Sequence, residues 1–318
     1  MTGVLIIDKP TGPTSHDVVT MVKKRLGARK VGHIGTLDPL ATGVLPLCIN
    51  EATKLARFLE KGEKEYLATI KLGEETDTYD SEGVVVAKGD ITSITKESIV
   101  SAINDFKGRI KQIPPMFSAV KMDGVPLYKL ARQCVTVERK PRDVEIYSID
   151  ITNITLPFIT INAICSRGTY IRSLAFDIGR KLGCGAHLVS LRRMKSGMFS
   201  LKDSISINDL KDLQEDILHN NIIPVERLFS NIPDIEVDTI TANKIMDGMA
   251  PNTKTFSAGV NFFPSIRDNE MIRFTANGRI IALATYKGEE GFKLERVLKN
   301  SEAHPCLIHT GAGLENRR

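Results

Sequence analysis

The chain has 318 residues, of which 42% are hydrophobic and 25% are charged, and its formal net charge is +5. This composition excludes a wholly disordered protein, and the length is enough for about two domains that each bury a core. No stretch approaches the roughly 18 consecutive apolar residues that span a bilayer, so we expect no membrane segment. The five cysteines form no C-x-x-C pair, which favours a reduced, cytoplasmic compartment.

The first part of the chain alternates between strand and helix patterns. GVLIID (3–8) predicts a buried strand rather than a signal peptide, because it is short and no basic segment precedes it. Ser15 is expected to cap the helix that follows, and the alternating run 64–73 predicts a half-buried strand. Two Ile- and Thr-rich strands are expected within 144–165, and a helix over 169–183 that ends at its last glycine.

A change of composition marks a domain boundary within residues 220–238, which carry two prolines and a polar Asn pair. Beyond this segment, one short helix pattern precedes two apolar strands joined by Asn277-Gly278, a strong signal for a type I′ hairpin. The second part of the chain is therefore expected to be small and mostly β. The expected parts are a domain over 1–230, a domain over 231–305 and a tail over 306–318.

Positive charge is concentrated in one part of the sequence. Residues 1–230 carry 32 basic and 27 acidic residues, whereas residues 231–318 carry 11 of each. Within 161–200, seven basic residues accompany a single acid, Asp177. Solvated helix faces are often basic, but an imbalance this large favours a polyanionic partner, with nucleic acid the leading candidate. The seven are Arg167, Arg172, Arg180, Lys181, Arg192, Arg193 and Lys195.

The common cofactor and metal motifs are missing from the sequence. It contains no GxxxxGK[ST] loop and no GxGxxG after a strand, so nucleotide-cofactor binding has no support. Cys184 and His187 are spaced like half of a zinc site, but no second pair accompanies them. We therefore expect neither a cofactor nor a metal.

Residues 32–46, GHIGTLDPLATGVLP, surround a single carboxylate, Asp38, with turn-forming residues. Pro39 biases Asp38 toward an extended backbone, and the three glycines would let another backbone or a ligand approach closely. An Asp-Pro turn is the commoner explanation of such a pattern. The alternative is a nucleophile that works without an acidic neighbour.

Three further side chains are candidates for the same site. Arg172 falls at the border of the apolar stripe of the 169–183 helix, so its guanidinium could reach a carboxylate or stay in solvent. Tyr66, at the start of a strand, is either an ordinary half-buried residue or a platform for a base. His33, close to Asp38, is either a turn residue or a side chain that inserts among bases.

Six segments occur in an order that is specific in combination. The sequence resembles the TruB family of tRNA pseudouridine synthases over most of residues 3–200, with DKPxG, GTLDPxATGVLP and GTYIRSL as the most specific motifs. The C-terminal part is similar to a diverged PUA domain, an RNA-binding module typical of the family. The segments are GVLIIDKPTGPTSHDVV, GHIGTLDPLATGVLPLCINEATKLARFL, KEYLATIKLGEETDTYDSEG, FKGRIKQIPPMFSAVKMDGVPLYKLAR, CSRGTYIRSLAFDIGRKLG and AHLVSLRRMKSG.

The resemblance implies an α+β fold with a mixed, largely antiparallel sheet and a small, mostly-β PUA-like domain. It implies isomerisation of uridine 55 in the T arm of tRNA to pseudouridine, without cofactor or metal. The family's essential aspartate falls on Asp38, its partner arginine on Arg172 and its base-stacking tyrosine on Tyr66. The apolar residue under the base falls on Leu191, and the loop histidine linked to nucleotide flipping falls on His33.

Two other functions would use the same domain. A guide-RNA-dependent synthase, like the catalytic subunit of box H/ACA particles, shares the aspartate motif but usually carries extra terminal segments. An RNA chaperone that folds tRNA would retain the domain without depending on turnover. The expected partner is the T-arm stem-loop of tRNA; no obligate protein partner is expected, and nothing in the sequence demands more than a monomer.

Overall fold

In the computed structural model, the described residues are 1–133, 135–252 and 266–299. The chain divides into two compact units, Met1–Pro224 and Val225–Arg318, and the division falls inside the proline-containing segment 220–238. The expected tail over 306–318 lies outside the described residues. In the described part of the chain, no helix is both long enough and apolar enough to cross a membrane.

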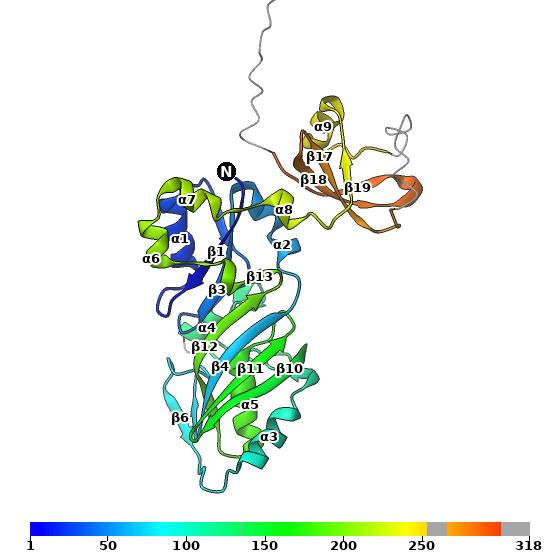
Figure 1. Ribbon diagram of the computed structural model, residues 1–318. Helices are drawn as coiled ribbons and strands as arrows, with labels where there is room; N and C mark the ends of the chain where they lie inside the picture. Colours follow the sequence, from blue (N-terminus) through cyan, green and yellow to red (C-terminus); the bar gives the residue numbers. More distant parts are fainter. Residues whose placement is uncertain (134, 253–265, 300–318) are drawn as a thin grey trace, which may run out of the picture. The chain divides into compact units, whose positions relative to one another are not determined.

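The first unit is built on an 11-stranded sheet that is mixed and largely antiparallel, which confirms the expected fold class (Figure 1). Its main path runs β14-β1-β3-β12-β4-β11-β10-β7, with β2, β13 and β15 paired at its sides. The parallel pairs are β1 with β14 and β3 with β12. The strands are β1 (Gly3–Lys9), β2 (Val31–His33), β3 (Thr42–Ile49), β4 (Lys64–Leu72), β7 (Gly108–Gln112), β10 (Arg142–Thr155), β11 (Phe158–Cys165), β12 (Ala186–Ser196), β13 (Phe199–Ser200), β14 (Ile205–Ser206) and β15 (Ile223–Pro224).

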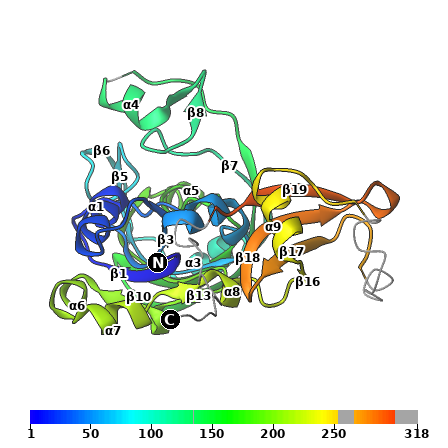
Figure 2. The ribbon, with the colours of Figure 1, turned by 90° about the horizontal axis from the view of Figure 1, so that it is seen from above.

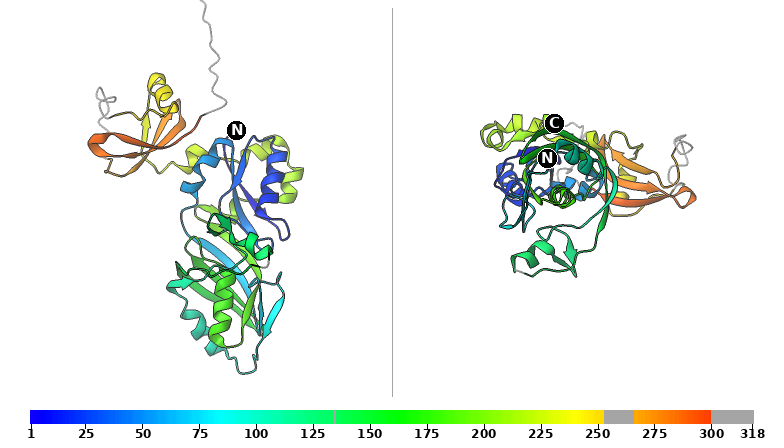
Figure 3. Two further views of the ribbon diagram at one scale, coloured as in Figure 1. Left: turned by 180° about the vertical axis from the view of Figure 1, so that it is seen from behind. Right: turned by 90° about the horizontal axis from the view of Figure 1, so that it is seen from below.

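Helices and two short ribbons complete this unit. Helix α5 (Ile171–Leu182) packs on β12, and α3 (Lys96–Asn104) lies beside α5 (Figure 3). The segment with β8, β9 and α4 stands away from the sheet (Figure 2). The remaining elements are α1 (Ser15–Arg25), α2 (Ala56–Leu59), α4 (Leu127–Arg132), α6 (Ile207–Asp212), α7 (Glu215–Asn220), the ribbons β5 (Glu74–Thr76) with β6 (Val85–Lys88) and β8 (Lys121–Met122) with β9 (Val125–Pro126), and the 3₁₀ helices Asn50–Leu55 and Leu201–Asp203.

The local patterns of the sequence explain most of these elements. Strand β4 alternates between buried and more accessible residues, as expected for 64–73. Helix α5 buries one face and ends at Gly183, which adopts the left-handed conformation typical of a helix C-terminus. One expectation is wrong: Thr14, not Ser15, caps α1, because Thr14 and Asp17 form a capping box. The Ser15 hydroxyl bonds instead to the backbone of Leu37.

The described part of the second unit contains a four-stranded sheet in the order β16-β17-β18-β19, in which β16 is parallel to β17. Asn277 and Gly278 join β17 to β18 with φ values of 51° and 70°, as a type I′ turn requires, so the predicted hairpin is confirmed. The elements are α8 (Val225–Leu228), β16 (Asp234–Glu236), α9 (Thr239–Met246), β17 (Met271–Ala276), β18 (Arg279–Tyr286), the 3₁₀ helix Gly288–Glu290 and β19 (Phe292–Val297).

Candidate active site

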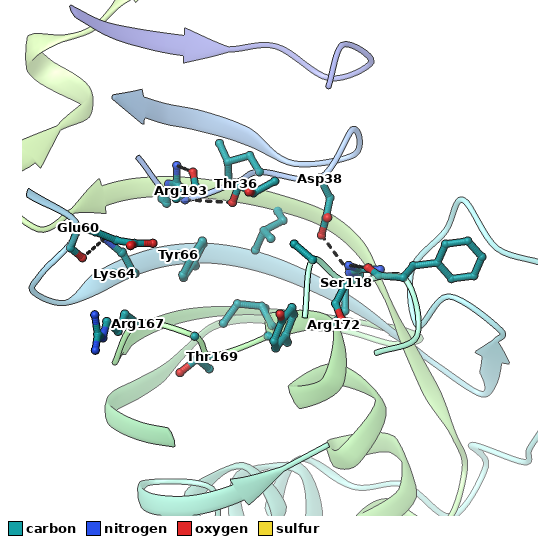
Figure 4. A pocket seen from close by; sticks show the side chains of 18 of the residues that line it. Thr36, Asp38, Glu60, Lys64, Tyr66, Ser118, Arg167, Thr169, Arg172 and Arg193 are labelled. Atoms are coloured by element: carbon teal, nitrogen blue, oxygen red, sulfur yellow. Dashed lines mark hydrogen bonds and ion pairs between the residues drawn. The ribbon is translucent and has the colours of Figure 1, made fainter. Parts of the chain in front are cut away.

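A cavity of about 470 Å³ lies in the first unit, where the Asp38 loop, β4, β12 and the start of α5 meet (Figure 4). This volume is within the range of sites for small ligands. Asp38, Tyr66, Arg172 and Leu191 all line the cavity, although they are far apart in the sequence. The structure thus brings together four of the five candidate residues.

His33 is the candidate that does not line the cavity. It ends β2, where it pairs with Leu47 of β3, and it is half-buried. Burial lowers the pKa of its imidazole, so the ring is neutral at physiological pH. Its Nδ1 is buried and has no hydrogen-bond partner among the described residues.

Asp38 and Arg172 form an ion pair. The Nε atom of Arg172 lies 3.0 Å from Oδ2 of Asp38, and its Nη1 lies 3.3 Å from Oδ2 of Asp80. The Arg172 residue is only 4% exposed, whereas 37% of the Asp38 side chain is accessible. A guanidinium held at the base of the cavity therefore presents one carboxylate, that of Asp38, to the open space.

Backbone carbonyls hold Arg172 in this position. Its Nη2 donates to the carbonyl oxygen of Phe117 at 2.7 Å, and its Nη1 donates to that of Thr78 at 3.3 Å. Gln112 fixes the start of α5, because its side chain bonds to both the N–H and the C=O of Tyr170. The helix has no side-chain cap of its own at this end. The orientation of Arg172 is therefore set by segments outside its own helix.

Burial raises the pKa of Asp38, and the nearby Asp80 carboxylate raises it further. Arg172 opposes this shift, both as a positive charge and as a hydrogen-bond donor. Burial is the larger effect, so the pKa of Asp38 lies above its ordinary value of 3.8. Asp38 is consequently a better base than a solvated aspartate, and Arg172 favours its ionised form.

Tyr66 and Leu191 come from the neighbouring strands β4 and β12 and form an apolar surface in the cavity. Ala68 of β4 is the register partner of Leu191, and Tyr66 is the partner of Arg193. Both Tyr66 and Leu191 are buried. Burial also raises the pKa of the Tyr66 phenol, so its hydroxyl stays protonated at neutral pH. An aromatic and an aliphatic side chain together can hold a flat heterocycle.

Two buried cations that sequence reasoning missed fix the Asp38 loop. The Lys9 ammonium donates to the carbonyl oxygens of Ala41 at 2.7 Å and Pro39 at 3.2 Å. Arg193 donates from Nε to Val44 at 2.7 Å and from Nη2 to Gly35 at 3.0 Å. Backbone carbonyls thus replace water around both charges, and the loop is held from both sides. Lys9 belongs to the DKPxG motif, and this motif was the sequence feature that could have indicated its role.

Close backbone approach at the loop is confirmed for Gly43. Its φ is +98°, and a Cβ atom there would lie 2.2 Å from the carbonyl oxygen of Arg193. Gly35 also has a positive φ, +74°, and lies beneath the Arg193 guanidinium. These two positions therefore need glycine for backbone reasons.

The structure corrects the interpretation of the seven basic residues in 161–200. Five of them have partners within the chain: Arg193 binds loop carbonyls, and the other four form ion pairs. Arg167, Arg180, Lys181 and Lys195 are exposed, and Arg167 also lines the cavity. The positive charge offered to a polyanion is thus smaller than the sequence count implies. The four ion pairs are Arg172–Asp38, Arg180–Glu75, Lys181–Asp105 and Arg192–Asp8.

The end of the cavity opposite Asp38 carries another buried cation, Lys64 (Figure 4). The Lys64 ammonium donates to Oγ of Ser196 at 2.9 Å and to the carbonyl oxygen of Glu60 at 3.3 Å. Burial lowers its pKa to about 8. Residues 1–133, 135–252 and 266–299 contain no group of three His, Cys, Asp or Glu side chains placed to hold a metal ion.

Solved structures with the same architecture support this description of the fold. A Cbf5–Nop10–Gar1 complex is 27% identical, with a TM-score of 0.67 over 93% of this chain and 85% of that chain. An H/ACA RNP bound to a substrate RNA containing 2′-deoxyuridine is 25% identical, with a TM-score of 0.66 over 94% of this chain and 86% of that chain.

Two family models define the class of the protein as a pseudouridine synthase, an isomerase. Residues 23–171 match the TruB family pseudouridylate synthase N-terminal domain, and residues 172–230 match the tRNA pseudouridylate synthase B C-terminal domain. Proteins named tRNA pseudouridine synthase B from Clostridium tetani and Clostridium acetobutylicum are 43% and 44% identical, over 94% of this chain and 100% of each relative. The chain belongs to the TruB family of pseudouridylate synthases.

Proposed function

We propose that this protein isomerises uridine 55 in the T arm of tRNA to pseudouridine, with Asp38 acting on a nucleotide that has flipped out of its loop. The observation that carries the proposal is the Asp38–Arg172 ion pair, 3.0 Å long, in a cavity with the Tyr66 and Leu191 side chains on its walls. The names of the relatives support tRNA as the substrate.

The chemistry needs one carboxylate and no change of oxidation state. The C1′–N1 bond breaks, the uracil turns, and a C1′–C5 bond forms, while the proton at C5 is lost and N1 gains one. Asp38 can attack C1′, add to C6 of the ring, or remove a proton to give a glycal. The proposal includes no cofactor and no metal ion.

Arg172 keeps this carboxylate ionised during the reaction. A base that enters the cavity excludes water from Asp38, which raises the cost of its charge. The guanidinium, already bound to Phe117 and Thr78 carbonyls, does not need to reorganise when this happens. Arg172 therefore offsets the desolvation of the nucleophile.

Flipping the target nucleotide costs a few kcal/mol, which contacts in the cavity must offset. We expect the uracil to stack on the Tyr66 ring and to pack against Leu191. Exposed basic side chains such as Arg167 would bind the phosphates. His33 helps to displace the nucleotide from its stack; its place next to the loop and its unpartnered Nδ1 support this role. The C-terminal unit acts as a PUA-like module with additional RNA contacts.

A synthetic T-arm stem-loop tests the proposal. The purified protein should convert one uridine, at the position of residue 55, and chromatography of the digested nucleosides should detect the product. The matched control carries cytidine at that position and should give no pseudouridine. Conversion at another position, or none in either this stem-loop or full-length tRNA, would overturn the proposal.

The likeness to H/ACA structures favours one other function, guide-RNA-dependent modification. Such an enzyme would be inactive on a bare stem-loop and would need partner proteins and a guide. The experiment above separates the two, because we propose that this protein acts in the cytoplasm as a monomer without an obligate partner. Activity that appears only with a guide would favour the alternative.

A further inference from the structure

Ser118 lies between β7 and β8, lines the cavity and is 4% exposed. Its backbone is fully bonded: its N–H donates to the carbonyl oxygen of Met116, and its carbonyl oxygen accepts from the N–H of Tyr128, both at 3.0 Å. Its hydroxyl, in contrast, is buried and has no hydrogen-bond partner among the described residues. Such a hydroxyl destabilises the folded protein unless something else satisfies it.

The three buried cations of the cavity, in contrast, have partners within the protein. Arg172, Arg193 and Lys64 all donate to backbone or side-chain oxygens. The Ser118 hydroxyl is near enough to Tyr170 to lower the pKa of that phenol, which burial raises, but the contact falls short of hydrogen-bonding geometry. The unsatisfied hydroxyl therefore points to a ligand rather than to the protein.

Ser118 lies at the end of the cavity where Asp38 is found (Figure 4). The carbonyl oxygen of its neighbour Phe117 accepts a bond from Nη2 of Arg172, and Nε of the same guanidinium contacts Asp38. Ser118 therefore lies directly next to the residue whose carbonyl holds the Arg172 guanidinium against Asp38.

We propose that the Ser118 hydroxyl binds the ribose 2′-hydroxyl of the target uridine and thereby selects RNA over DNA. The inference rests on the proposed function, in which Asp38 acts close to the C1′–N1 bond. The 2′-hydroxyl is attached to C2′, directly next to C1′, whereas the C5–C6 edge of uracil carries only C–H groups. Both hydroxyls donate and accept, and a bond to the ribose persists while the uracil turns.

A double-mutant cycle tests this contact. Wild-type protein, Ser118→Ala and Ser173→Ala are each assayed on T-arm stem-loops with uridine or 2′-deoxyuridine at the target position. Ser173→Ala is the matched control, because its buried hydroxyl donates to the carbonyl oxygen of Ile113 within the protein. We expect Ser118→Ala to lose about tenfold in kcat/KM on uridine and to lose little more on 2′-deoxyuridine.

Stability separates binding from a structural role. Ser118→Ala should melt at the wild-type temperature or higher, because it removes an unsatisfied polar group, whereas Ser173→Ala should melt lower and keep the wild-type preference for uridine. An unchanged preference for uridine in Ser118→Ala, or equal rates of the wild type on both substrates, would overturn the inference and leave the proposed function intact. A wild type that converts neither substrate would refute the proposed function itself.

Discussion

The Asp38 loop and the β17–β18 hairpin both reverse the chain with glycines at positive φ, but different forces hold them. The hairpin is specified locally, since Asn277 and Gly278 adopt the two left-handed conformations that its turn requires. The loop is specified from a distance, by Lys9, Ser15 and Arg193, whose bonds to it cross 22 to 158 positions of the sequence. A turn that only reverses the chain can be local, whereas a turn that aims a carboxylate is fixed by the rest of the domain.

The largest effect is expected at the tip of the loop. Asp38→Asn keeps the shape of the side chain but removes its charge, so we expect a loss of at least about a thousandfold in kcat on tRNA with unchanged tRNA affinity. Asp105→Asn, in a surface ion pair with Lys181, is the matched control and should remain active. Appreciable turnover by Asp38→Asn would refute the proposed catalytic role of Asp38.

A substitution of Arg172 tests whether this side chain changes the pKa of Asp38 as well as its position. Arg172→Lys keeps a cation but loses the bonds to two carbonyls, so we expect about a hundredfold lower kcat/KM. Arg172 lowers the pKa of Asp38, so a weaker contact lets that pKa rise and moves the acid limb of the pH–rate profile to higher pH. A uniform loss at every pH would mean that Arg172 only supports the fold.

A glycine-to-alanine substitution at each site compares the two directly: Gly43, where the Asp38 loop enters β3, and Gly278 in the hairpin. In Gly43→Ala the new Cβ would lie 2.2 Å from the carbonyl oxygen of Arg193, and β3 or β12 would have to move. We expect about 3 kcal/mol lower free energy of unfolding, together with lower activity. Denaturant unfolding and a single-turnover assay measure the two effects. A Gly43→Ala protein with wild-type stability would show that the loop tolerates a shift.

Gly278→Ala meets no atom within 4 Å, and only the backbone conformation at φ +70° opposes it. The expected cost is about 1 kcal/mol, confined to the melting of the C-terminal unit. Hydrogen exchange resolves the two units and so provides the measurement. Costs of equal size at Gly43 and Gly278 would contradict the distinction between the two turns.

The smallest effect concerns α5, which carries Arg172. Burial raises the pKa of Asp177 on this helix from 3.8 to about 6. Between about pH 4 and pH 6 the folded state holds a proton that the unfolded state has lost, so stability falls as the pH rises through this range and stays lower above it. Asp177→Asn should therefore stabilise the protein by about 1 kcal/mol at pH 7 to 8, with the gain lost as the pH falls toward 4. A gain that is independent of pH would argue against this explanation.

The contrast between the two turns also explains which elements and site residues could be predicted from the sequence. Strand β4, helix α5 and the Asn277-Gly278 hairpin were predictable, because each depends on spacing within a few residues. The identity of Ser15 as a cap was wrong, because Thr14 and Asp17 form the competing capping box. Local patterns favoured an ordinary turn at Asp38, and only the family resemblance indicated a site there.

The residues that position the site left weaker signals. Asp80 lies in a polar segment and Gln112 in a segment with no recognisable site pattern, and each gains its role from a contact across the fold. Ser118 follows two prolines, and only its burial without a partner singles it out. Arg193 was counted as a base for RNA, because a sequence does not reveal which cations are buried. Asp80, Gln112, Ser118 and Arg193 all lie in the segments that resemble the family. Residues that position the site could therefore be sought in those segments.

The parallel pairing of β3 with β12 involves only two residue pairs, Thr42 with Arg192 and Gly43 with Arg193. The aspartate loop precedes β3 on one side of this seam, while Tyr66 and Leu191 belong to strands on the other side. The hydrophobic core runs without a break across this seam, and the bonds of Arg193 to Val44 and Gly35 cross it, so packing and hydrogen bonds together keep Asp38 next to Tyr66 and Leu191.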